Sequence, residues 1–123
     1  MPVYLRGMNS VHLIGNLATD VELRDVSEEK KVASFLLAID RGSKDGGADF
    51  VWISAWDRQA ELCAQYLGKG NRVAVDGRLK SRTWEQDGRR RDAVEVVARR
   101  VEFLTAPTRE EGAEVIPFEA ATA

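Results

Sequence analysis

A single helix-like segment set among strand-like runs is the feature that most restricts how this 123-residue chain can fold. Runs rich in β-branched and aromatic residues cover residues 10–17, 31–40, 49–56, 72–84 and 92–104, and residues 21–24 read as a short extension of the first run. Asp57 as an N-cap, the helix formers of residues 58–67 and Gly68 as a stop predict one helix between the third and fourth strands.

An order of three strands, one helix and two strands is the layout of the OB-fold, a five-stranded Greek-key barrel whose surface binds oligonucleotides or oligosaccharides. The predicted fold class is therefore all-β with one short helix. Residues 1–104 form one domain in this reading. Residues 105–123 contain Pro, Gly and acidic residues with no hydrophobic period, which predicts a short, acidic, disordered tail.

Charge is unevenly distributed along the chain. The net charge is −2 overall, but residues 69–100 carry 10 basic and 5 acidic residues, whereas residues 105–123 carry 1 basic and 4 acidic residues. A basic segment beside an acidic tail is compatible with a nucleic-acid partner, even though the whole chain is slightly acidic.

Signals for catalysis and metal binding are weak. One Cys and one His cannot build a Cys/His zinc site, and a single Cys cannot form an internal disulfide. His12 has no catalytic partner in sequence, Cys63 reads as a core residue, and no nucleophile-elbow, zinc-protease or Walker motif is present. We therefore expect a protein that is not an enzyme and has no metal or cofactor. The lack of a secretory signal or long apolar run predicts a cytoplasmic location without membrane contact.

Aromatic side chains are concentrated in the third strand-like run. Side chains of a strand alternate between its two faces. In residues 49–56 this puts Phe50, Trp52, Ser54 and Trp56 on one face, and Val51, Ile53 and Ala55 on the other. The second face alone is apolar enough to line a core. The aromatic face either packs under a loop or against another subunit, or it stacks nucleobases. The residues alone leave both readings open.

The fourth strand-like run adds a row of positive charge. Arg78, Lys80, Arg82 and Trp84 alternate onto one face, where cations could follow phosphates while the indole stacks a base. The simpler alternative is a solvated edge strand protected by Lys and Arg. The signal Asp87-Gly88 predicts a hairpin, and the basic run of residues 89–91 then forms a loop tip.

Three segments resemble the bacterial single-stranded DNA-binding protein family: "RGMNSVHLIGNL", "AELCAQYLGKGNRVAVDGRLKSRTW" and "VEVVARRVEFL". The resemblance extends over residues 6–104. It implies an OB-fold that assembles as a homotetramer, with no cofactor and no catalysis. It also implies sequence-nonspecific binding and protection of single-stranded DNA in replication, recombination and repair.

The resemblance also suggests individual contact residues. Trp84 matches the family's stacking Trp, and Phe50 and Trp56 fall at aromatic contact positions. Trp52 shares their face, although the family more often has a polar or basic residue there. Arg6, Lys69 and Arg82 match basic positions that touch the DNA backbone. Arg58, Arg72, Arg78 and Lys80 are further basic candidates by location.

The chain also departs from the family pattern. Residues 40–43 lack the stacking Trp that many members have after the second strand. The family ends in an acidic tail with a terminal Pro-Phe, whereas here five residues follow Phe118 in the Ile116-Pro117-Phe118 segment. We therefore do not expect recruitment of protein partners through a terminal carboxylate on this residue. The main alternative function is an OB-type protein-interaction module with secondary nucleic-acid binding, and an RNA-binding OB protein is a third.

Overall fold

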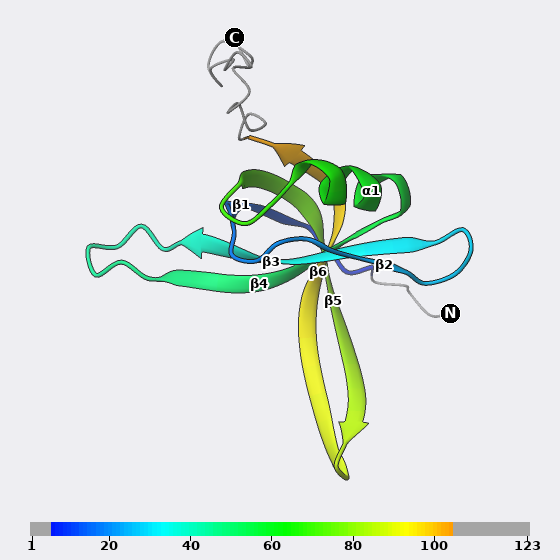
Figure 1. Ribbon diagram of the computed structural model, residues 1–123. Helices are drawn as coiled ribbons and strands as arrows, with labels where there is room; N and C mark the ends of the chain where they lie inside the picture. Colours follow the sequence, from blue (N-terminus) through cyan, green and yellow to red (C-terminus); the bar gives the residue numbers. More distant parts are fainter. Residues whose placement is uncertain (1–5, 105–123) are drawn as a thin grey trace.

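The computed structural model describes residues 6–104, which form a small β-barrel with one helix (Figure 1). In chain order the elements are β1 (Val11–Leu17), β2 (Glu22–Asp25), β3 (Lys31–Asp40), β4 (Ala48–Trp56), α1 (Asp57–Tyr66), β5 (Arg72–Gln86) and β6 (Arg89–Phe103). The Ile116-Pro117-Phe118 segment and the rest of the predicted tail lie outside the described residues.

Five of the strands close into a barrel. The strand order is β1-β5-β6-β4-β3, and a further antiparallel pairing of β1 with β3, at Asn16↔Ala38 and Leu17↔Leu37, completes the ring. All neighbours run antiparallel except β4 and β6, which pair in parallel at Ile53↔Val96 and Ser54↔Val97. The all-β prediction and the five-stranded OB-fold barrel are confirmed.

The interior of the barrel is filled by aliphatic side chains and one aromatic ring. The buried cluster consists of Leu17, Ala33, Phe35, Leu37, Ile53, Ala55, Ala60, Cys63, Leu67, Val73, Val75, Val96 and Ala98. Burial raises the pKa of the Cys63 thiol to about 11. The thiol therefore stays protonated at neutral pH, which makes it a core residue and a poor nucleophile, as predicted.

Residues 21–24 do not extend β1, contrary to the sequence prediction. The chain turns after Leu17, where the Ala18 N–H donates to the Leu36 carbonyl at 2.7 Å and the Leu36 N–H donates to Thr19 Oγ1 at 3.1 Å. It then returns as the separate strand β2, which pairs antiparallel with β3 from Glu22↔Ser34 to Asp25↔Lys31. The sheet therefore has six strands, with β2 added outside the barrel.

The ends of α1 also differ from the prediction. Asp57 is the first residue of α1 and not its N-cap, and its φ of 56° lies in the left-handed region. The extended Trp56 occupies the N-cap position and makes no side-chain capping bond. The Asp57 carboxylate instead accepts the Lys31 N–H at 3.3 Å. The helix ends at Tyr66, before Gly68, because the extended Leu67 turns its side chain into the core.

Only a narrow face of α1 meets the barrel. Ala60 and Cys63 are fully buried, but Tyr66 is 51% exposed and packs against Phe103, with ring centroids 6.3 Å apart and an interplanar angle of 52°. Within residues 6–104 no helix has both the length and the apolarity needed to cross a membrane.

A long hairpin of β5 and β6 projects from the barrel on the side away from α1 (Figure 1). Its predicted two-residue turn is confirmed, since Asp87 and Gly88 have φ of 54° and 75°. Positive φ at both central residues is the geometry of the tight turn that Asp-Gly favours. Because the turn is so short, residues 89–91 lie in β6 and pair with β5, so they are strand residues and not the predicted loop tip.

Candidate nucleic-acid interface

The outer face of β4 is aromatic and open to solvent. Phe50 is 59% exposed, Trp52 is 52% exposed and Trp56 is 36% exposed. On the opposite face, Ile53 and Ala55 are at most 1% exposed. The strand thus divides as its alternation predicts, with one face in the core and the other outside. Large aromatic side chains left in solvent on one face typically mark a binding surface.

Two of these aromatic residues line a groove between β2, β3 and β4 on one side and the β5–β6 hairpin on the other. The groove has a volume of about 480 Å³ and is lined by Glu22, Arg24, Val26, Val32, Ser34, Trp52, Ile53, Ser54, Trp56, Lys80, Arg82 and Glu95. Sites that hold small ligands have volumes of about 300–1,000 Å³. The groove is therefore large enough for nucleobases.

Strand register explains how these side chains reach the same surface. Directly paired residues of neighbouring strands point to the same face. Arg24 pairs with Val32 and Val32 with Trp56, so these three form one row across the outer surface. Glu22 pairs with Ser34 and Ser34 with Ser54, which gives a second row beside the first.

The β5–β6 hairpin supplies the opposite wall and most of its positive charge. Arg82 lies on the same face as Trp84, and its Cζ is 5.3 Å from the centroid of that ring, a cation–π arrangement. Its Nε is also 3.8 Å from Glu95 Oε1. The groove lining therefore combines the cations of Arg24, Lys80 and Arg82 with the carboxylates of Glu22 and Glu95.

The other predicted basic residues lie outside this lining. Arg78 is exposed on β5, on the same face as Lys80 and Arg82. It pairs with Val97 of β6, and Val97 in turn pairs with Ser54 of β4. Arg6 is exposed at the start of the described chain. Lys69 and Arg72 lie at the connection from α1 to β5, where the Arg72 Nη1 donates to Asn16 Oδ1 at 2.9 Å.

Arg58 is on a different surface. Its side chain is 80% exposed, with Nη1 3.8 Å from Glu61 Oε1. It lines a separate depression that also contains Glu28, Glu29 and Asp57. The structure does not bring Arg58 to the groove, and its contact with DNA stays a prediction.

Sequence reasoning missed the contribution of β2 and of the polar residues between the aromatic ones. Glu22, Arg24, Ser34, Ser54 and Glu95 all line the groove, and none was predicted as a site residue. A signal for β2 was available, because Glu22 and Arg24 alternate onto one face of a short strand. Their pairing with β3 could not be read from that pattern.

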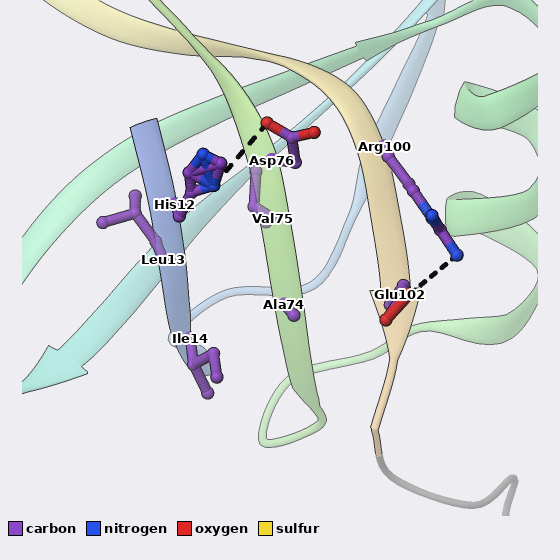
Figure 2. Close-up of a pocket in the computed structure, with 8 residues that line it drawn as sticks. All are labelled: His12, Leu13, Ile14, Ala74, Val75, Asp76, Arg100 and Glu102. Carbon is purple, nitrogen blue, oxygen red and sulfur yellow. Dashed lines mark ion pairs between the residues drawn. The ribbon is translucent and has the colours of Figure 1, made fainter. Parts of the chain in front are cut away.

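A second depression lies across β1, β5 and β6 (Figure 2). His12, Asp76 and Arg100 form one cross-strand row of its surface, and Ile14, Ala74 and Glu102 form the next. Arg100 and Glu102 form an ion pair here, with Nη2 2.8 Å from Oε2, and His12 Nδ1 lies 3.9 Å from Asp76 Oδ1. With Ile14 50% exposed and no Trp in its lining, this surface is unlike the groove.

In the part of the chain that the structure describes, no group of three or more His, Cys, Asp or Glu side chains could hold a metal ion. His12 is the only His of the chain, and its side chain is 69% exposed on β1.

Comparison with known proteins identifies relatives of one kind. The model of the single-strand binding protein family matches residues 8–104. Single-stranded DNA-binding protein 3 of Clostridium acetobutylicum is 45% identical over 102 residues, which cover 79% of this chain and 71% of that protein. Single-stranded DNA-binding protein 1 of Chlorobaculum tepidum is 38% identical over 109 residues, which cover 82% of this chain and 67% of the relative. The single-stranded DNA-binding protein of Treponema pallidum is 40% identical over 102 residues, which cover 79% of this chain and 58% of that protein.

Proposed function

We propose that this chain, which belongs to the single-strand binding protein family, binds and protects single-stranded DNA without recognising a defined sequence and without catalysis. The observation that carries the proposal is the groove, in which exposed indoles and cations lie together. Its lining joins Trp52 and Trp56 to Lys80 and Arg82, with Trp84 beside Arg82. Replication, recombination and repair are the processes that expose such strands.

Stacking and charge have separate roles in this proposal. Every nucleobase has a π-face, so an aromatic platform contributes about 1–3 kcal/mol per stacked base whatever the sequence. Phe50, Trp52, Trp56 and Trp84 are the proposed platforms. Cations neutralise phosphates and make the affinity depend on salt. The proposed phosphate contacts in and beside the groove are Lys80, Arg82 and Arg78. Outside the groove, the proposed contacts with the rest of the DNA strand are Arg6, Arg58, Lys69 and Arg72.

The proposal assigns DNA binding to residues 1–104 and leaves residues 105–123 as a separate acidic segment. Acidic residues repel phosphates, so the tail is not expected to add to the affinity for DNA. A protein that binds DNA in this way is expected in the cytoplasm, with the nucleoid.

The two groove cations of the β5–β6 hairpin, Lys80 and Arg82, provide a quantitative test. Each phosphate contact on a single strand contributes about 0.7 to the slope of log K against log salt. Replacing Lys80 and Arg82 with Ala should therefore make the slope for oligo-dT less negative by about 1.4. The slope is measured by fluorescence anisotropy of a labelled oligonucleotide at several salt concentrations.

Arg100→Ala is the control for this test, because Arg100 lies in the second depression and pairs with Glu102. It should leave the slope within about 0.3 of the original protein's slope, less than half of one phosphate contact. An unchanged slope in the Lys80→Ala/Arg82→Ala variant would contradict the assignment of these cations to phosphates.

We also propose that the chain assembles as a homotetramer. Two features support this. Residues 11–15 of β1 pair only with β5 among the described residues, so the other edge of this segment can accept a second strand. Ile14 is 50% exposed on the face that carries the second depression. Light scattering of the full chain should give about four times the 13.7 kDa of one copy. A monomeric mass would overturn this part of the proposal.

A further inference from the structure

The outer half of the β5–β6 hairpin, residues 83–92, extends beyond the groove and is here called the hairpin arm (Figure 1). Its two strands pair without a register shift from Thr83↔Asp92 to Gln86↔Arg89. Directly paired residues of antiparallel strands point to the same face. This register therefore decides to which side of the arm each of the three arginines of residues 89–91 points.

One face of the arm continues the aromatic and basic face of β5, and we call it the front. Trp84 pairs with Arg91 and Gln86 pairs with Arg89, so both arginines share the face of Arg82 and Trp84. The Cβ atoms of a direct pair are about 5 Å apart, which places the Arg91 side chain beside the indole. Trp84 is 40% exposed, and the two arginines are exposed as well.

The cations on the front of the arm are unpaired. In the part of the chain that the structure describes, neither Arg89 nor Arg91 forms an ion pair or a side-chain hydrogen bond. The groove, in contrast, has the carboxylates of Glu22 and Glu95 among its lining residues. An arginine without an acidic partner gives up no protein contact when it binds a phosphate.

The other face of the arm, its back, has the opposite character. Arg90 pairs with Glu85 in the sheet, and its Nε lies 3.6 Å from Asp92 Oδ1. The Thr83 hydroxyl donates to the same Asp92 oxygen at 2.9 Å. The back therefore holds one cation with two carboxylates, whereas the front holds two cations and no carboxylate. A hairpin that is only solvated needs charge on both faces, but it does not need the charges sorted by sign.

We propose that the front of the hairpin arm is a second subsite for the DNA strand, in which Trp84 stacks a base and Arg91 and Arg89 bind phosphates between this base and the tip. The proposal rests on the single-strand binding proposed above and extends the path of the strand from the groove along the arm. The planar guanidinium of Arg matches phosphate oxygens in pairs. Stacking and phosphate contacts both ignore base identity, so the subsite keeps the binding independent of sequence.

The dimensions of the arm suit a short piece of single strand. Residues 82–86 of β5 span about 13 Å at about 3.3 Å per residue. Phosphates of one stacked strand are about 3.4 Å apart, so this length accommodates about two to four nucleotides, the lower number for an extended strand. The Arg82 side chain over the Trp84 ring is 64% exposed, so it can leave the ring when a base stacks there.

The salt dependence of binding tests the two arginines. Each phosphate contact on a single strand contributes about 0.7 to the slope of log K against log salt. Arg89→Ala/Arg91→Ala should therefore make the slope for an oligo-dT of about 16 nucleotides less negative by about 1.4. Between about 50 and 200 mM salt, its affinity would then fall about seven-fold less than that of the original protein. Arg89→Lys/Arg91→Lys should keep the original slope within about 0.3, because it retains both charges.

The emission of Trp84 tests where the strand lies. Trp52→Phe/Trp56→Phe leaves Trp84 as the only Trp of the chain and keeps an aromatic ring at both positions. Oligo-dT should quench the emission of this protein through stacking on Trp84. Adding Arg89→Ala/Arg91→Ala should reduce the quenching at saturation by at least about two-fold, because the strand then no longer follows the arm. Equal quenching with and without the two arginines would contradict the proposal.

Arg90→Ala is the matched control for Arg91→Ala, because each removes one positive charge, from the back and from the front of the arm. Arg91→Ala alone should change the salt slope by about 0.7, and Arg90→Ala should change it by less than about 0.3. Equal changes in the two variants, or an unchanged slope in Arg89→Ala/Arg91→Ala, would overturn the subsite and leave binding in the groove intact. Failure of the original protein to bind oligo-dT at low salt would instead overturn the proposed function.

Discussion

Replacing both Trp52 and Trp56 with Ala should weaken binding of oligo-dT by at least about thirty-fold. Each lost stacking platform removes about 1–3 kcal/mol, and each 1.4 kcal/mol is a factor of ten in affinity. The two indoles are 52% and 36% exposed on the outside of the barrel, so their removal does not open the core. Anisotropy titration of a labelled oligonucleotide gives the affinity, and circular dichroism shows that the fold is retained.

Tyr66→Ala is the matched control, because Tyr66 is an aromatic residue of similar exposure on α1, away from the groove lining. It should change the affinity less than about two-fold, since no base stacks on it in this proposal. A loss of less than about five-fold in the double Trp variant would mean that neither indole contributes a full stacking contact. Trp52 is of special interest, since the chain lacks the aromatic residue that the family often has after its second strand.

Gly77→Ala should destabilise the fold by about 3 kcal/mol, the upper end of the usual cost of overpacking. Gly77 lies at the register shift between β5 and β6, where a Cβ would collide with the Val97 carbonyl oxygen. The obstacle is backbone of a paired strand and cannot rotate away. Folded domains of this size are stable by only about 5–15 kcal/mol, so the loss would be a large fraction of the total.

Gly7→Ala is the control for this variant, because a Cβ at Gly7 meets no atom within 4 Å. It should leave the stability unchanged or raise it slightly through the unfolded state. Urea unfolding of both variants gives the comparison. A loss below about 0.5 kcal/mol in Gly77→Ala, the range of a neutral surface change, would contradict the close approach of β5 to β6 at this position.

The alternation of side chains along a strand was the most informative part of the sequence. In β4 it separated the core face from the aromatic face, and in β5 it placed Arg82 and Trp84 on one surface, where they are in contact. These predictions succeed because alternation is a local property of an extended chain. The order of the elements likewise identified the barrel.

The parts that the sequence did not predict depend on long-range pairing. The sequence pattern predicts residues 21–24 as an extension of β1, and only the register of β2 with β3 brings Glu22 next to Ser34 and into the groove. Asp57 has the chemistry of an N-cap, but it becomes the first residue of α1 because Trp56 continues β4 up to the helix. The Ser54 hydroxyl is buried without a hydrogen-bonding partner among the described residues, which could not be predicted, since it depends on the packing around it.

The measurement that tests the central claim most directly is Trp fluorescence during titration of the full chain with oligo-dT, with duplex DNA of equal length in parallel. All three Trp residues of the chain, Trp52, Trp56 and Trp84, are 36–52% exposed at or beside the groove. Base stacking on them should quench the emission deeply with the single strand and little with the duplex, and added salt should weaken the effect. Unchanged emission with oligo-dT at low salt would contradict single-strand binding by this face, and would favour a surface that contacts protein instead.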